Sequence, residues 1–148
     1  MPEGLVYSLV AIAERFLVEQ DQVLSAIRLV DVFFVDPAPP GIPAETLAVM
    51  INLLVITKFS RGVKSEHTIQ VKLLRPSGAQ KPIGESRAVQ IDSGEKYPTA
   101  PSGFNGVFQI PVLTTEMGTH YLIVEVDDEE IARAPFTFVA RVSEPSTN

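Results

Sequence analysis

Hydrophobic and polar residues alternate along several short segments of this chain with a period of two, which is typical of β-strands. The clearest segment runs from His120 to Val126, and a second alternating segment returns over Ile131–Arg141. The acidic turn Asp127–Glu130 separates the two segments, so the pattern predicts a β-hairpin. The same alternation predicts strands over Leu5–Glu14 and His67–Arg75.

The segment Thr46–Ser60 is apolar on nearly every side and can be interpreted in two ways. Pro43-Ala44-Glu45 resembles a helix start, and a helix over residues 46–56 would make the fold α+β. Read as a strand, its alternate residues form one continuous apolar face. We favour the strand because the next strand, His67–Arg75, pairs naturally with it through the loop Arg61–Glu66.

Three further segments complete the predicted set of strands. Leu24–Val35 is a long apolar run rich in Val, Ile and Phe, which favours a strand over a helix. A weaker strand is expected over Ile83–Ile91, and another over Phe104–Thr115. Residues 36–43 contain four prolines and are expected to form an irregular connection, as is Asp92–Gly103.

Composition and length fit one folded domain. The chain has 148 residues, of which 45% are hydrophobic and 20% charged, and this balance argues against disorder. We expect a single domain over residues 1–142, followed by a polar tail over 143–148. About seven to nine short strands without a convincing helix predict an all-β fold, an immunoglobulin-like antiparallel β-sandwich. The mean hydropathy of +0.19 is high for a monomer, so apolar surface shared with a partner is expected.

Two local patterns resemble known proteins. Gly118-Thr119-His120-Tyr121, followed by Ala134-Pro135-Phe136, resembles the penultimate-to-last hairpin of immunoglobulin-like bacterial domains. This resemblance implies a structural role for Gly118 and a tyrosine corner at Tyr121, although the Cys, Trp and Cys of antibody domains are absent. Ala13–Phe33 is similar to the opening of a bacterial family of small β-sandwich proteins of unknown function. That second resemblance continues through the strands of Leu47 and Ile69, and it implies a fold but no activity.

Charge and cysteine content narrow the possible partners and compartment. A formal charge of −6 argues against binding to nucleic acid or to an anionic membrane surface. The absence of cysteine excludes disulfides and thiolate chemistry and suits a cytoplasmic protein. Leu5–Ala13 ends in a formal match to a cleavage site, but Glu3 and the lack of a preceding basic residue argue against a signal peptide. The longest apolar run, Leu47–Ile56, is about half the length that a membrane span requires.

Candidate chemistry in the sequence is sparse. His67 and His120 lie in no known metal-ligand spacing, so we predict neither a metal nor a cofactor. The acidic run Asp127–Glu130 could in principle hold calcium, but adjacent acids in a tight turn point in different directions. We interpret this run as a solvated hairpin tip. No serine lies in a nucleophile-elbow motif, and we predict that the protein is not an enzyme.

Loops are the best binding candidates, because a rigid sandwich presents its connections at its two ends. The long connection 92–106 contains Tyr97, Phe104 and Asn105, which are our candidate binding residues. Phe104 is the one more readily explained by packing against the sandwich. We therefore predict a non-enzymatic module, bacterial or phage-derived, that acts through a protein partner or as a homo-oligomer. The alternative is small-ligand or carbohydrate binding by the 92–106 connection.

Overall fold

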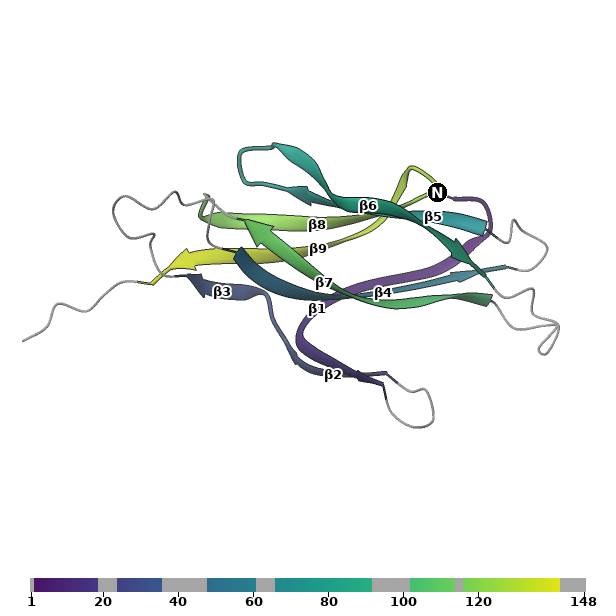
Figure 1. Ribbon diagram of the computed structural model, residues 1–148, viewed down its shortest axis with the longest axis horizontal. Helices are drawn as coiled ribbons and strands as arrows, with labels where there is room; N and C mark the ends of the chain where they lie inside the picture. The colour runs from purple at the N-terminus through teal and green to yellow at the C-terminus, as the bar shows by residue number, and fades with distance from the viewer. Residues whose placement is uncertain are drawn as a thin grey trace, which may run out of the picture.

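The computed structural model describes residues 2–18, 24–35, 48–60, 66–91, 102–113 and 116–141. Across these ranges it contains nine strands and no helix, arranged as two sheets that pack face to face (Figure 1). The prediction of an all-β sandwich is confirmed. No helix in these ranges is long and apolar enough to cross a membrane. The proline-rich connection, the 92–101 segment and the predicted tail lie outside the described residues.

Sheet A has four strands in the order β2-β1-β4-β7, and sheet B has five in the order β3-β9-β8-β5-β6. Sheet A consists of β1 (Leu5–Val18), β2 (Leu24–Leu29), β4 (Ala48–Phe59) and β7 (Ser102–Leu113). Sheet B consists of β3 (Val32–Val35), β5 (Glu66–Leu74), β6 (Gln80–Gln90), β8 (Gly118–Val126) and β9 (Glu129–Ala140). Neighbouring strands are antiparallel except for β3 and β9, which are parallel.

The core lies between the sheets and is built from alternate residues of each central strand. These residues are apolar and almost fully buried, because a strand directs every second side chain to the same face. An aromatic cluster lies at one place in this core, where Phe136 and Phe138 pack edge to face with ring centroids 5.3 Å apart. Phe33 of β3 packs against both rings and anchors that short strand to sheet B.

The strand interpretation of residues 46–60 is confirmed, but its predicted pairing is wrong. β4 pairs with β1 and β7, whereas β5 pairs with β6 and β8 in the other sheet. The chain therefore crosses from one sheet to the other between β4 and β5 instead of forming a hairpin. The physical reason is that β4 and β5 each have an apolar face, represented by Leu53 and Ile69, and placing them in opposite sheets directs both faces into the one core.

The predicted long strand 24–35 is divided in two. β2 belongs to sheet A and β3 to sheet B, and the chain bends between them at Val30 and Asp31. Arg28 has a φ of 53°, in the left-handed region that breaks a regular strand. Backbone hydrogen bonds hold the bend to both sheets: the Val30 amide donates to Ile12, and the Thr137 amide donates to the Asp31 carbonyl.

The final hairpin is present as predicted, with a tighter turn. β8 ends at Val126 and β9 begins at Glu129, so only Asp127 and Asp128 form the turn. Both have positive φ, at 50° and 66°. A two-residue turn with two positive φ values matches the right-handed twist of the strands, and Asp is among the residues that tolerate it.

Candidate interaction surfaces

Sheet A carries apolar side chains on the face directed away from the core. Cross-strand partners share a face, so the register of β1, β4 and β7 places a set of apolar residues together on this outer side. The set comprises Tyr7, Leu9, Ala11, Met50, Leu54, Ile56 and Val107. Met50 is 54% exposed, whereas Leu54 at the middle of the face is only 6% exposed. Asn52, Asn105 and Gln109 lie on the same face, and Lys58 is its charged member where β1, β4 and β7 pair, so this surface is largely apolar and nearly uncharged.

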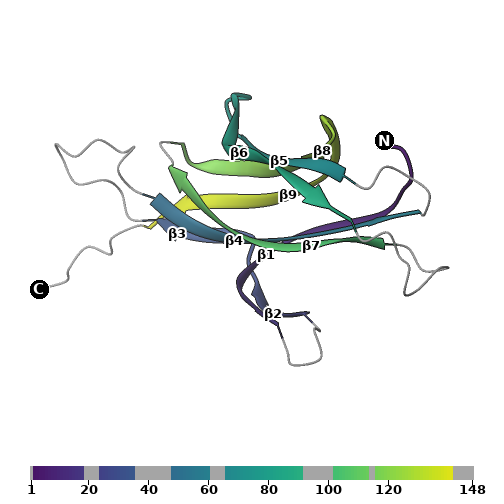
Figure 2. The ribbon, with the colours of Figure 1, turned by 45° about the vertical axis from the view of Figure 1, so that its right-hand side comes forward.

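The hairpin formed by β1 and β2 projects from this same side of the molecule. β1 pairs with β4 as far as Ala13 and then with β2 from Ala13 to Val18. Figures 1 and 2 show β2 leaving the sandwich on the side of sheet A that faces away from sheet B. Leu29 on this arm is 73% exposed. An isolated two-stranded ribbon is at best marginally stable in water, so a surface that covers this arm would stabilise it.

The outer face of sheet B is polar over β5, β8 and the first half of β9, whereas Val32, Phe34 and Val139 are exposed where β3 pairs with the end of β9. The Lys72 ammonium contacts the Glu125 carboxylate at 2.8 Å, and the hydroxyls of Thr119 and Thr137 are 3.0 Å apart. Ile123 also lies on this outer face, yet it is only 2% exposed. Its cross-strand neighbours are Lys72 and Arg133, whose long aliphatic stems cover it while their charged ends reach water.

A groove opens along one side of the sandwich between β6 of sheet B and β7 of sheet A. It consists of two adjoining cavities of 280 and 210 Å³, both lined by Ile83, Gly84 and Pro111. The floor of the larger cavity is apolar and includes Val71, Phe108 and Ile110. In the described strands, β6 pairs only with β5 and β7 only with β4, so the groove runs between two free sheet edges.

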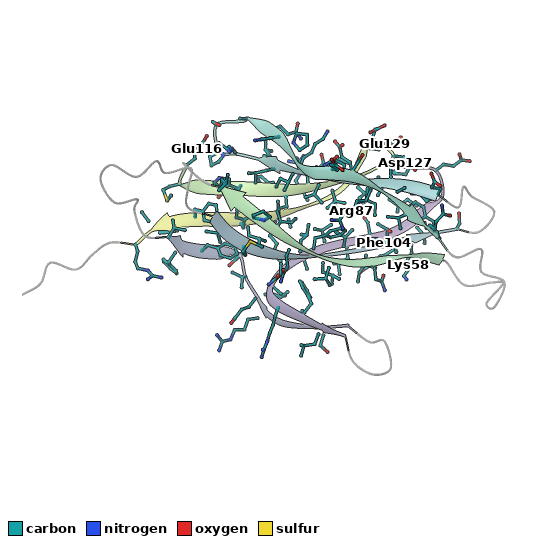
Figure 3. All side chains as sticks on the ribbon, viewed as in Figure 1. Lys58, Arg87, Phe104, Glu116, Asp127 and Glu129 are labelled. Atoms are coloured by element: carbon teal, nitrogen blue, oxygen red, sulfur yellow. The ribbon has the colours of Figure 1, made fainter. Side chains whose placement is uncertain are left out.

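Basic side chains dominate the rim of this groove. Arg87, Lys81 and Arg75 line it, and Glu85 is the acidic lining residue. The Arg87 guanidinium carbon lies 5.7 Å from the centre of the Phe108 ring, a cation–π contact that holds it at the opening. Figure 3 labels Arg87 between the two sheets. In a chain with a formal charge of −6, this rim is locally positive.

His67 is buried at the start of β5 and bonded to the turn of the last hairpin. Its Nδ1 lies 2.6 Å from Asp127 Oδ2, and its ring stacks on Phe59 at 4.2 Å. The second oxygen of Asp127 accepts a hydrogen bond from the Thr68 amide. Asp127 therefore links the last hairpin to the start of β5. The part of the acidic run at the hairpin tip is reduced to Asp128, Glu129 and Glu130.

His120 is fully buried in the aromatic cluster. Its ring stacks on Phe136 with centroids 5.2 Å apart, and its Nδ1 lies 3.0 Å from the Gly118 carbonyl oxygen. Burial lowers the pKa of this imidazole, although the hydrogen bond to Gly118 opposes the shift. The neutral ring then donates from Nδ1. No group of three or more potential metal ligands occurs among the described residues.

Of the three predicted binding residues, the structure describes Phe104 and Asn105, and these two lie on different faces of one strand. The strand predicted from Phe104 begins at Ser102, so Phe104 and Asn105, which were assigned to the binding loop 92–106, are residues of β7. They consequently point to opposite faces: Phe104 packs against the core and Asn105 is exposed on the outer face. Tyr97 lies outside the described residues. The sequence signal for the outer face of sheet A was the run of apolar residues on both faces of β4, which Asn52, Thr57 and Lys58 interrupt.

The residues suggested by resemblance lie at the start of β8. Gly118 has a φ of 108°, which favours glycine, and a side chain there would contact Pro76. Tyr121 is half-buried on the outer face of sheet B, where the Arg133 guanidinium lies 5.5 Å from its ring centre.

Comparisons with known proteins assign the chain to no family. No protein-family model and no curated protein sequence matches the chain. One solved structure with a similar arrangement is the Pseudomonas fluorescens alkylpurine DNA glycosylase AlkC bound to DNA containing an abasic site analog. The likeness has a TM-score of 0.43 at 15% identity, and it covers 87% of this chain but only 30% of that one. A similarity at this level has no bearing on function.

Proposed function

We propose that the protein is a non-enzymatic interaction module that self-associates through the outer face of sheet A. The observation that supports this proposal is the apolar, nearly uncharged outer face of β1, β4 and β7, to which Met50 and Leu9 contribute exposed side chains. Contiguous exposed apolar surface is uncommon on monomers and marks interaction sites. The high mean hydropathy of the chain agrees with such a surface.

A second copy is the partner that this surface suits best. The rest of the molecule is acidic on average, so two copies approaching at random repel each other. The outer face of sheet A lacks that repulsion and offers the same apolar patch on both copies, as a twofold interface requires. The projecting β1–β2 arm lies beside this face (Figure 2), where a facing copy could cover it.

The order of the strands supports an immunoglobulin-type sandwich as the scaffold of this module. β1, β4 and β7 would correspond to strands A, B and E of one sheet, and β5, β8 and β9 to strands C, F and G of the other. Such a scaffold presents rigid sheet faces, which favours a function in binding partners over a function in catalysis.

Analytical ultracentrifugation of the full chain tests the self-association. We expect the wild-type protein to sediment as a dimer and the double variant Leu9→Lys/Met50→Lys to sediment as a monomer, because four ammonium groups would be buried in the twofold interface. The matched control is Thr68→Lys/Thr119→Lys, which adds the same charge to the outer face of sheet B. A monomeric wild type, or a control that dissociates equally, would refute the proposal.

A further inference from the structure

The groove between β6 and β7 carries a second binding site that is separate from the outer face of sheet A. We propose that it binds an extended peptide segment in which apolar and acidic residues alternate. The groove is bounded by free strands of two different sheets, and its floor joins the half-buried Ile83 and Phe108 to core residues such as Val71 and Ile110.

The shape of the groove favours a peptide over a compact ligand. Its two cavities, of 280 and 210 Å³, adjoin in the direction of the strands and share Ile83, Gly84 and Pro111. Sites for small molecules are typically about 300–1,000 Å³, so each cavity is small for such a ligand. Successive inward side chains of one extended segment would instead fill the cavities one after another.

The free edge of β7 supplies backbone partners for this segment. β7 has 12 residues, and its pairing partner among the described strands is β4, on one side only. An incoming strand can therefore add to the other side, with main-chain hydrogen bonds for affinity and cavities for alternate side chains. Pro111 has no amide hydrogen and limits backbone pairing at its end of β7.

The opposite wall of the groove is widened by an irregularity in β6. Val71 pairs with Ile83 and Ile69 with Arg87, so three residues of β6 stand opposite one residue of β5. Gly84, at the start of this bulge, has a φ of 70°. A bulge of this kind bends the edge strand and prevents β6 from closing onto β7.

Charge at the rim decides the chemistry of the segment. Arg87, Lys81 and Arg75 are basic and Glu85 is acidic. Carboxylates on the outward side of a bound segment would pair with this positive rim, while a basic segment would be repelled. Arg87 is preorganised for the pairing because its guanidinium already lies over the Phe108 ring.

Gly106 keeps the floor of the groove in place. A Cβ atom at this position would lie 2.5 Å from the Phe104 ring and 3.0 Å from the Phe108 ring. The absence of a side chain lets these two aromatic rings lie 6.2 Å apart on the same face of β7. Phe108 is thereby held where it both lines the groove and supports Arg87.

Selection from a display library of random decapeptides, with the full chain as the target, tests the proposal. We expect enrichment of peptides in which apolar residues alternate with Asp or Glu. Synthetic copies of the enriched peptides are expected to bind the double variant Lys81→Glu/Arg87→Glu at least about tenfold more weakly, which corresponds to about 1.4 kcal/mol. Amide hydrogen exchange in β7 is expected to slow when such a peptide binds the wild-type protein.

Two further variants make the result specific. Arg15→Glu/Lys58→Glu changes the net charge by the same amount outside the groove lining and should bind the peptides as wild type does. Leu9→Lys/Met50→Lys should also retain peptide binding, so that failure of the self-association proposal and failure of this one can be distinguished. No enrichment, enrichment of basic peptides, or equal binding by the groove variant would overturn the proposal. Dissociation of the dimer by the groove variant would instead identify a second copy as the occupant.

Discussion

The two sheets of this sandwich differ in the side chains that surround their outward apolar residues. Leu54 on sheet A and Ile123 on sheet B occupy comparable places, since both point away from the core and both are nearly inaccessible. The cross-strand neighbours of Leu54 are Ala11 and Val107, whereas those of Ile123 are Lys72 and Arg133. Sheet B thus covers its outward apolar residue with charged side chains, and sheet A covers it with more apolar surface.

This difference shows that the molecule shields the outward apolar residue of sheet B from water with its own charged side chains, whereas the outer face of sheet A lacks such a cover. The charged ends over Ile123 remain in water and make ion pairs, with Glu125 for Lys72 and with Glu130 for Arg133. Sheet A has no comparable charged cover over the described part of β4, and it gains free energy when a partner removes its apolar side chains from water. Sheet B also buries His120, whose pKa is lowered by that burial, so the effect of acid should fall mainly on that sheet.

The largest expected effect comes from truncating the two outward residues. Ile123→Ala and Leu54→Ala should each lower the free energy of unfolding by about 2–5 kcal/mol, measured by urea denaturation. The two variants should differ in self-association: Leu54→Ala weakens the dimer, and Ile123→Ala leaves it intact. Ile123→Val is the conservative control. If Ile123→Ala lowered the free energy of unfolding by less than Ile123→Val does, the aliphatic stems of Lys72 and Arg133 would not bury this residue.

An intermediate effect is expected from acid. Because the pKa of His120 is lowered in the folded protein, the unfolded chain takes up a proton first as the pH falls below about 6.5. Stability contributed by the neutral ring is therefore fully present above that pH and decreases below it, by up to about 1.4 kcal/mol per pH unit. His120→Phe should remove this part of the pH dependence in urea titrations. An unchanged slope would contradict the assignment.

The smallest effect is expected at the ion pair of sheet B. Lys72→Met keeps an unbranched apolar stem beside Ile123 and loses only the contact with Glu125, so it should cost about 1 kcal/mol or less. Lys72→Ala should cost more, because it also uncovers Ile123. Equal costs for the two variants, compared by thermal unfolding at low and high salt, would mean that charge and not coverage matters at this position.

Strand positions and their buried faces could be predicted from local pattern. The alternation in β5, β8 and β4 identifies residues such as Ile69, Leu122 and Leu53, and all three are buried in the core. Pairing could not be predicted in the same way, because β4 and β5 each satisfy their pattern equally well side by side or across the sandwich. The division of 24–35 escaped prediction for a similar reason: both halves are apolar, and the bend depends on bonds to Ile12 and Thr137.

The candidate surfaces were less predictable than the fold. Sequence reasoning placed binding in the 92–106 connection, yet Phe104 and Asn105 belong to β7 and face opposite ways. The groove joins Arg87 of one sheet to Phe108 of the other, and no local spacing relates two such residues. The apolar outer face of sheet A had a signal in the two-sided apolar pattern of β4, but a central buried strand produces the same signal.

By itself, the sequence determined that the chain forms strands, which residues of those strands are buried, and that an acidic turn closes the last hairpin. These properties depend on the period of side chains along a strand and on local turn chemistry. Only the tertiary structure decided which strands pair, which apolar face stays exposed and where two free edges enclose a groove. Those properties depend on contacts between residues far apart in the chain, where several arrangements satisfy the same local pattern.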